Sequence, residues 1–243
     1  MAYFRAKNKC WDLIKKHYPI YEGKAPIIES LVRNYIKRDS VLLDVGCGRG
    51  KETAICYKNE VNLAIGIDLS DKIKFNETIH LPIVADACKL PLGDSSVDLV
   101  ISQELIEHLE YPEKLFSEVS RILKANGVFV FATPNLLSWK SLISLVTPHS
   151  LHIKLNKQLH GVKAEDVFPT YYRMNRIRKI QKVMPKYNMK LDRLIMWEGT
   201  PKTLTFNSIA TYIDIFITTL LRKKDSLKNY RELIVASYRK EAS

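Results

Sequence analysis

The chain is poor in cysteine, and the placement of its cysteines argues against two kinds of site. None of the four belongs to a Cys-x-x-Cys pair, and all of them lie far apart in the sequence. This spacing is typical neither of a zinc site nor of the disulfide framework of a small secreted domain. The sequence therefore predicts no metal site, and it predicts reduced thiols in a cytoplasmic protein. The cysteines are Cys10, Cys47, Cys56 and Cys88.

Long uninterrupted apolar runs are absent as well. Residues 1–19 carry charges throughout and lack the apolar core of a signal peptide. One mostly apolar stretch, residues 204–221, contains Asn207 and Asp214, and a carboxylate near the middle of a lone membrane span is costly. We therefore predict a buried or interfacial helix there, in a cytoplasmic protein whose association with a membrane surface is left open.

The composition is that of a folded protein with an uneven charge. Apolar residues make up 46% and charged residues 26% of the chain, which suits a single α/β domain with insertions. Residues 1–40 hold nine Lys and Arg against four Asp and Glu, residues 41–135 nine against fourteen, and residues 136–243 twenty against eight. Such basic flanks suit nucleic acid, anionic lipid or an anionic small substrate, although a solvated surface explains them equally well.

Apolar strands alternate with helical patterns in the first half of the chain, which predicts a doubly wound parallel sheet. Strands are expected at residues 41–45, 61–67, 83–85, 97–102 and 127–132, and helices at 25–36, 51–58 and 112–123. The rhythm changes after residue 135, where residues 136–172 are predicted to be an insertion. Further helices are expected at 174–184 and 204–221, and further strands at 191–197 and 233–238.

The strongest local signal is a glycine-rich turn after the first predicted strand. Gly46, Gly48 and Gly50 alternate with Cys47 and Arg49, and Asp44 lies two residues before the first glycine. Glycines let the chain turn sharply and let backbone N–H groups approach a ligand closely. A lone Gly-x-Gly-x-Gly is weak evidence, but here it follows a strand and precedes a helical pattern, which is the context of a nucleotide-binding loop.

Two further acids end the next two predicted strands. Asp68 lies in Gly66-Ile67-Asp68-Leu69-Ser70, and Asp86 lies in Ala85-Asp86-Ala87. A carboxylate at the first position can accept hydrogen bonds from ribose hydroxyls, and one at the second can accept from an exocyclic amine. For either acid alone, a role as the cap of a turn or a helix is the favoured explanation, because Asp is common in such caps.

From residue 41 to 135 the chain resembles the class I S-adenosylmethionine-dependent methyltransferases. The resemblance rests on LLDVGCGRG, GIDLS, DACKLPLGDSSVDLVISQELIEHL and LKANGVFVFATPN in this order. It implies a seven-stranded, mostly parallel Rossmann-like sheet whose last strand, 233–238, is antiparallel. The domain would span residues 41–243 behind an N-terminal helical region, residues 1–40.

The resemblance also implies how S-adenosylmethionine, and its product S-adenosylhomocysteine, would be held. Asp44 and residues 46–50 would cradle the methionine part, and Asp68 with the adjacent Leu69 would bind at the ribose. The adenine would meet Asp86 and Ala87, and Ser102 and Gln103 would face the sulfonium end. The chain departs from the family in having a shorter segment between Asp68 and Asp86, and Tyr187-Asn188 where a Gly-Phe pair is common.

The acceptor of the methyl group is only partly constrained. Amine-directed nucleic-acid methyltransferases resemble one another in an Asp/Asn-Pro-Pro-aromatic box after the fourth strand, whereas this chain has Ser102-Gln103-Glu104-Leu105 there. Cytosine carbon-5 methyltransferases use a Pro-Cys pair, and this sequence contains none. Both observations argue against these two classes of acceptor. Residues 161–173 and Thr133-Pro134-Asn135 look similar to methyltransferases of bacterial surface-polysaccharide and secondary-metabolite pathways. That likeness suggests oxygen methylation of a small molecule, a sugar or a lipid-linked acceptor.

His108 is the first candidate for a catalytic base, since it follows the fourth predicted strand and histidine titrates near neutrality. Ordinary histidine usage favours a packing or capping role for His108 over a catalytic one. His160, Tyr171 and Tyr172 are further candidates. Two other functions stay open: an RNA methyltransferase that uses the basic C-terminal third, and a cofactor-binding protein that sits on anionic lipid through residues 204–221 and Arg222, Lys223 and Lys224.

Overall fold

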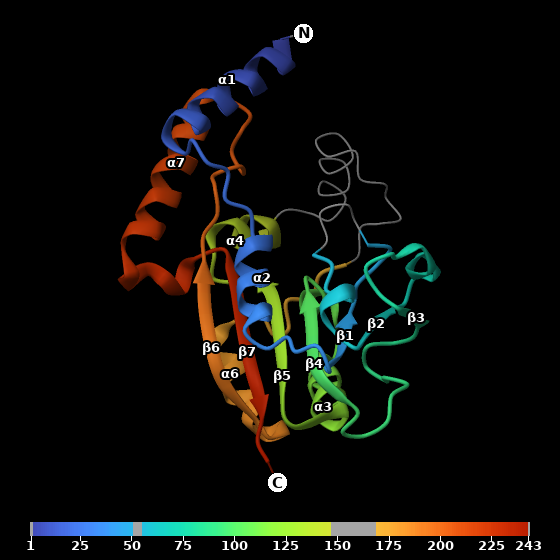
Figure 1. Ribbon diagram of the computed structural model, residues 1–243. Helices are drawn as coiled ribbons and strands as arrows, with labels where there is room; N and C mark the ends of the chain where they lie inside the picture. Colours follow the sequence, from blue (N-terminus) through green and yellow to red (C-terminus); the bar gives the residue numbers. More distant parts are fainter. Residues whose placement is uncertain (1, 51–54, 147–168, 243) are drawn as a thin grey trace.

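The computed structural model describes residues 2–50, 55–146 and 169–242 and contains a seven-stranded sheet (Figure 1). The strand order is β3-β2-β1-β4-β5-β7-β6. Strands β1 to β5 are parallel to one another, whereas β7 is antiparallel to both β5 and β6. The strands are β1 (Val41–Val45), β2 (Leu63–Asp68), β3 (Leu81–Val84), β4 (Val97–Gln103), β5 (Leu123–Pro134), β6 (Met189–Trp197) and β7 (Leu233–Lys240).

Helices cover both faces of the sheet. Successive strand residues point to opposite faces, so that Leu42 packs beneath α2 (Ala25–Arg33) and Leu43 packs in the cluster with α3 (Pro112–Ile122) and α6 (Ile177–Val183). Helix α3 begins at a proline, and its apolar residues recur at helical spacing and are all buried. Both layers are therefore apolar, and the inner strands between them are buried on both sides, whereas the edge strands β3 and β6 are largely exposed.

The described structure confirms the predicted sheet and most predicted elements. Strand β1 has the predicted bounds, and the last strand is antiparallel as the resemblance implied. The expected helix at 51–58 is wrong where it can be judged: residues 55–57 are not helical, a short 3-10 helix η1 (Lys58–Glu60) follows, and residues 51–54 lie outside the described residues. Most of the predicted insertion, residues 147–168, also lies outside them.

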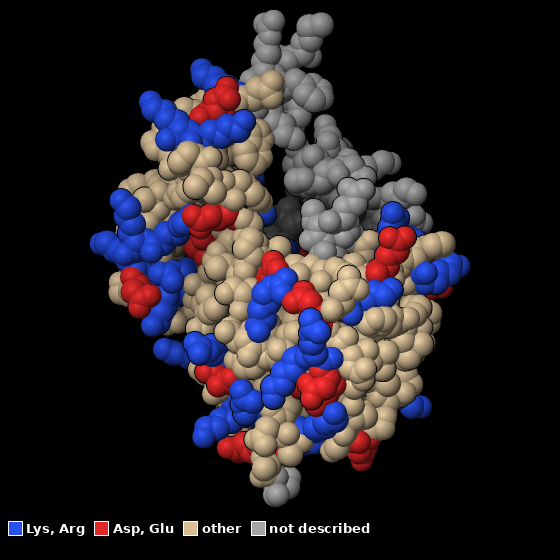
Figure 2. Space-filling view, in the orientation of Figure 1, with Lys and Arg blue, Asp and Glu red and all other residues tan. Residues whose placement is uncertain are grey.

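Two helices stand beyond the sheet and pack against each other. They are α1 (Ala2–His17) and α7 (Ser208–Lys223), which lie side by side at the upper left of Figure 1. Helix α7 corresponds to the apolar helix expected at 204–221. Figure 2 shows Lys and Arg side chains over this end of the molecule and along the neighbouring edge of the sheet. Among the described residues, no helix combines the length and the apolar character needed to cross a membrane.

Candidate functional site

The glycine-rich turn forms a tight loop at the carboxyl end of β1. Gly46, Gly48 and Gly50 have φ angles of 77°, 57° and 63°, in the region that side chains disfavour. The Gly46 N–H donates to the Ile67 carbonyl oxygen at 2.7 Å, which fastens the loop to β2. A Cβ atom on Gly48 would meet nothing within 4 Å, so the backbone there borders open space. The loop therefore leaves the backbone at Gly48 uncovered, and its contact with a ligand stays a prediction.

A residue that the motifs did not indicate holds this loop in place. Asn76, 6% exposed, donates from Nδ2 to the Gly48 carbonyl oxygen at 3.1 Å. Its Oδ1 accepts from the Thr78 N–H at 2.9 Å and lies only 2.5 Å from where a Cβ atom of Gly50 would be. Asn76 follows the 3-10 helix η2 (Asp71–Phe75). No local pattern marks it, because its role depends on the distance in space between two loops.

The electrostatics at the loop favour a positively charged ligand. Burial raises the pKa of the partly buried Asp44 to about 7, and the negative charge of Asp68 adds to this. Burial, followed by the charges of Asp44 and Asp68, also raises the pKa of the Cys47 thiol. Cys47 therefore stays a neutral thiol near neutral pH. A cation placed beside the two carboxylates would relieve their repulsion.

Asp68 ends β2 beside the loop and binds two backbone groups. Its Oδ2 accepts from the Gly48 N–H at 2.9 Å, and its Oδ1 accepts from the Ser70 N–H at 2.8 Å. The carboxylate thus caps a turn, and each oxygen has a second lone pair for a ligand hydroxyl. The adjacent Leu69 is 70% exposed. The structure brings Asp68 and the glycine loop together, as predicted.

Asp86 and Ala87 follow β3 at the same edge of the sheet. Asp86 is exposed, and its Oδ1 accepts from the Cys88 N–H at 2.8 Å. Ala87 is 7% exposed and packs in the main core. Asp86 is therefore a turn cap, which was one of its two predicted roles. The adenine contact stays a prediction.

Ser102 and Gln103 lie at the carboxyl end of β4, beside the loop. Ser102 is 1% exposed, and its Oγ has no hydrogen-bond partner among the described residues. An unpaired buried hydroxyl costs about 1–3 kcal/mol, so a ligand atom that bonds it would recover stability. Gln103 is partly buried. Together with the open backbone at Gly48, this orphan hydroxyl shows that the residues present fit a polar nucleoside ligand.

A buried carboxyl group that the motifs did not single out lies just beyond β4. Glu107, 3% exposed, accepts from the Thr133 hydroxyl at 2.9 Å. Thr133 in turn accepts from Nδ2 of the fully buried Asn175 at 2.7 Å. Burial raises the pKa of Glu107 to about 7 despite these hydrogen bonds. The 3-10 helix η3 (Ile106–His108) thus places a carboxyl group whose pKa is near neutral pH at the edge of the sheet where the parallel strands end.

The structure brings three of the four predicted base candidates together around Glu107. His108 Nδ1 donates to the Pro169 carbonyl oxygen at 2.8 Å, because that oxygen can only accept. The Tyr171 and Tyr172 N–H groups donate to the Glu107 carbonyl oxygen at 2.8 and 3.3 Å. With the proton on Nδ1, a neutral His108 ring carries its lone pair on Nε2. The fourth candidate, His160, lies outside the described residues.

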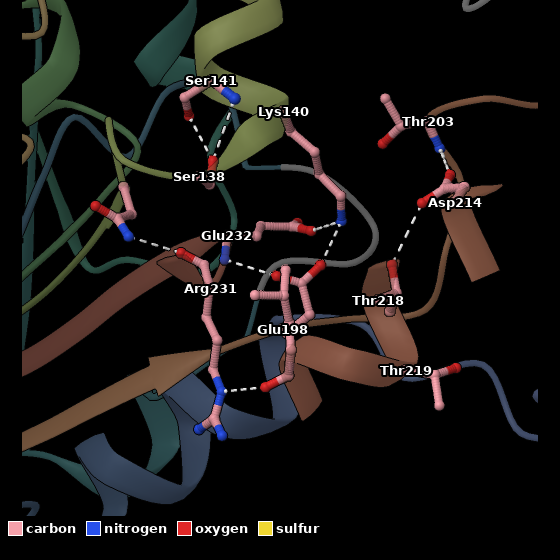
Figure 3. Close-up of polar contacts among 12 residues, drawn as sticks. Ser138, Lys140, Ser141, Glu198, Thr203, Asp214, Thr218, Thr219, Arg231 and Glu232 are labelled. Atoms are coloured by element: carbon pink, nitrogen blue, oxygen red, sulfur yellow. Dashed lines mark hydrogen bonds and ion pairs between the residues drawn. The ribbon is translucent and has the colours of Figure 1, made fainter. Parts of the chain in front are cut away.

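A buried ion cluster closes the same edge further along the sheet (Figure 3). Lys140 Nζ, from α4 (Trp139–Val146), donates to Glu198 Oε1 at 2.8 Å and also pairs with Glu232. Glu198 follows β6 and Glu232 precedes β7, so the cluster joins three elements. Its groups satisfy one another, which is the signature of a structural cluster. The described His, Cys, Asp and Glu side chains form no group of three or more that could hold a metal ion.

The comparisons with known proteins agree with this geometry. Residues 43–131 match the family model of a methyltransferase domain. An uncharacterized protein of Methanocaldococcus jannaschii is 34% identical over 140 residues, which is 55% of this chain and 53% of that protein. A malonyl-(acyl-carrier protein) O-methyltransferase of a Marinomonas species is 25% identical over 218 residues, covering 85% of this chain and 76% of that protein.

A solved structure is similar in fold over nearly the whole chain. The S-adenosylmethionine dependent methyltransferase from Mesorhizobium loti superposes with a TM-score of 0.59 at 19% identity, covering 89% of this chain and 97% of that chain. The chain thus spans the full fold of that protein but about half the length of the curated Methanocaldococcus relative. The matched region, residues 43–131, contains the glycine loop, Asp68, Asp86, Ser102 and His108.

Proposed function

Because the chain belongs to the class I S-adenosylmethionine-dependent methyltransferases, we propose that it transfers a methyl group to a hydroxyl oxygen of a small molecule, a sugar or a lipid-linked acceptor. The observation that carries this proposal is the pair Glu107 and His108 at the carboxyl end of β4. Both lie in the loop that follows Ser102 and Gln103, the residues assigned to the sulfonium end. S-Adenosylmethionine supplies the activated methyl group.

The chain's own residues hold the cofactor in this proposal. The backbone of the glycine loop and Asp44 would bind the amino-acid part, whose ammonium group would favour the ionised form of Asp44. Asp68 uses its remaining lone pairs for the ribose hydroxyls. Ser102 Oγ gains the hydrogen bond that it lacks among the described residues. Holding the two reactants close and aligned is worth roughly 7–11 kcal/mol of barrier in such transfers.

A hydroxyl acceptor is favoured because it needs a base. An alcohol must lose its O–H proton as it attacks the methyl group, so a base beside it assists the transfer. A neutral amine attacks with its free lone pair and needs no base at that step. His108 Nε2 accepts that proton in the proposed step, while Nδ1–H stays bound to the Pro169 carbonyl oxygen. The raised pKa of the adjacent Glu107 keeps a full negative charge away from the site near neutral pH. The Marinomonas relative, an O-methyltransferase, supports transfer to oxygen.

The test is to follow the methyl group. The protein is incubated with tritiated methyl donor and with separate lipid, glycan, RNA and small-molecule fractions of a cell extract. We expect label in a glycan, lipid or small-molecule fraction, and we expect prior acetylation of free hydroxyls in that fraction to abolish it. Label that survives acetylation of the hydroxyls, or that enters only RNA, would contradict the proposal.

His108 has a separate test with the acceptor so found. His108→Ala should lower kcat by about 100-fold or more with little change in KM, because general-base catalysis is worth about 10²–10⁴-fold. The matched control is His17→Gln, an exposed histidine on α1. Equal activities of the two variants would remove His108 from the mechanism.

RNA is the second candidate acceptor, supported by exposed cations along one helix. Helix α6 buries Ile177, Ile180 and Val183 against the sheet and exposes its basic residues. This is the pattern of a solvated helix face, so it favours RNA only weakly. RNA would be supported by an affinity that falls with salt concentration, with a slope of log affinity against log salt that corresponds to contacts with several phosphates. The cations concerned are Arg173, Arg176, Arg178, Lys179 and Lys182.

A further inference from the structure

Helix α7 exposes three large apolar side chains, although Ile215 and Leu221 of the same helix are buried. Ile209 is 77% exposed, Ile213 is 49% exposed and Phe216 is 67% exposed. Their spacing of four and three residues places them on one face of the helix. Phe206, 61% exposed, precedes the helix at its first turn. A surface helix of a globular protein normally points such a stripe toward the core.

The opposite, buried face of α7 carries polar side chains beside its apolar ones. Thr211, Asp214 and Thr218 are each at most 1% exposed. Asp214 Oδ2 accepts from the Thr203 N–H at 2.7 Å, and the Thr218 hydroxyl donates to Asp214 Oδ1 at 3.3 Å (Figure 3). The Leu204 N–H also donates to Asp214, at 3.0 Å. The helix is thus fastened to the segment before it through its polar side.

These hydrogen bonds fix the rotation of the helix. Turning α7 to bury Ile213 and Phe216 would separate Asp214 from both backbone N–H groups. A buried acceptor or donor left without its partner costs about 1–3 kcal/mol, and more when it is charged. The outward direction of the apolar stripe therefore follows from these polar contacts together with the burial of Ile215 and Leu221.

Helix α1 packs beside α7 without covering the stripe. Cys10 and Ile14 of α1 are buried, and the Tyr18 and Thr219 hydroxyl groups lie 2.7 Å apart. The exposed fractions of Ile209 and Phe216 are those that remain with α1 in place. A hollow of about 420 Å³ opens beside the stripe at the start of α7 and is lined by Asn207, Ser208, Ile209, Ala210 and Ile213. The stripe and its hollow therefore form one apolar surface.

Cations border this surface. Lys223 and Lys224 are exposed at the end of α7, and the neighbouring α1 exposes Lys9, Lys15 and Lys16. In Figure 2, Lys and Arg side chains lie over this end of the molecule. Apolar side chains flanked by Lys match an anionic bilayer surface, where headgroup phosphates lie above acyl chains. A protein partner would need an apolar groove ringed by acids to offer the same two matches.

We propose that α7 docks in the plane of an anionic membrane. Ile209, Ile213 and Phe216 enter the boundary between headgroups and acyl chains, and Lys223 and Lys224 bind phosphate groups. This surface is independent of the methyl acceptor, so it holds whether or not the substrate is lipid-linked. It would place the carboxyl edge of the sheet close to the bilayer surface, since α7 lies beyond that edge (Figure 1).

Co-sedimentation with vesicles tests the proposal. The full chain is mixed with vesicles of phosphatidylcholine alone or of phosphatidylcholine with phosphatidylglycerol. We expect binding to the mixed vesicles that weakens with added salt. Phe216→Gln and Ile213→Gln should each weaken it by about tenfold or more, because a buried Phe or Ile side chain contributes that much to transfer. Exposed positions tolerate such changes, and melting curves check that each variant is folded.

Matched variants distinguish binding through the stripe from nonspecific hydrophobic binding. The control is Phe75→Gln, because Phe75 on η2 is 66% exposed and lies outside the stripe. This variant should bind the mixed vesicles as strongly as the wild type does. Lys223→Gln with Lys224→Gln should weaken binding to the mixed vesicles, whereas Lys182→Gln with Lys186→Gln should weaken it less. Equal loss in Phe75→Gln and Phe216→Gln would overturn the proposal. The proposal would also be overturned if light scattering showed a dimer that Phe216→Gln dissociates, because the stripe would then be the interface between two copies of this chain.

Discussion

Glu107 is a carboxylic acid held almost out of water, and its environment makes a pH-dependent contribution to stability. Burial raises its pKa to about 7 in the folded protein, against an ordinary value of 4.5. Between these values the folded state binds a proton that the unfolded state has lost, so the contribution is full below about pH 4.5 and is lost as pH rises toward 7. The loss amounts to about 3 kcal/mol at neutral pH and above.

The substitution Glu107→Gln should remove this loss while keeping an acceptor for the Thr133 hydroxyl. Relative to the wild type, the variant should gain about 2 kcal/mol more unfolding free energy at about pH 8 than at about pH 5. Chemical denaturation at both pH values measures the difference. Glu110→Gln, at an exposed position three residues on, should show no such change. A variant whose relative stability is the same at both pH values would mean that Glu107 ionises as freely as a surface acid.

The residues of the site differ in how far sequence alone could indicate them. Asp44, Asp68 and the glycines were predictable, because each lies at the end of a strand or within a few residues after it. Glu107 and Asn76 were not, because their roles depend on partners that the fold brings from elsewhere. Glu107 meets Thr133, 26 residues further along the chain, and Asn76 meets Gly48, 28 residues before it. Asp86 was predicted with two roles, and the structure shows the turn cap.

At the scale of elements, the loop after β1 depends on glycine for two separate reasons. Gly50 has a left-handed φ of 63°, and a Cβ atom there would lie 2.5 Å from Asn76 Oδ1. Gly50→Ala should therefore lower the unfolding free energy by at least about 1 kcal/mol and should weaken cofactor binding. Gly93→Ala is the matched control, since a Cβ atom there meets nothing within 4 Å. Denaturation curves of both variants compare them, and equal stability would show that the loop tolerates a side chain.

Helix α7 illustrates what periodicity leaves open. The apolar stretch predicted a helix, and the helix is there with slightly shifted bounds. A period of 3.6 residues gives the faces of a helix but not the direction in which each face points. That direction follows from Asp214, whose backbone partners Thr203 and Leu204 lie 11 and 10 residues before it. Residues 55–57 show a different limit of periodicity: their sequence predicts part of a helix, but they are not helical in the fold.

At the scale of the whole molecule, the strand order explains why the separate motifs form one site. Strands β2, β1 and β4 are adjacent and parallel, so their carboxyl ends meet at one edge of the sheet. The glycine loop, Asp68 and Ser102 come from these three ends. This arrangement was predictable from the alternation of strands and helices, because crossover connections between parallel strands are right-handed and short. The placement of α1 against α7 was not predictable, because it depends on contacts between the two ends of the chain.

The central claim is that this edge binds S-adenosylmethionine, and calorimetric titration tests it most directly. The wild-type protein should bind both S-adenosylmethionine and S-adenosylhomocysteine. Asp68→Ala should weaken both affinities by at least about tenfold, because it removes hydrogen bonds to a charged group. Asp71→Ala, an exposed acid of η2, should leave both affinities unchanged. Absence of binding to the wild type, or an unchanged affinity in Asp68→Ala, would contradict the account.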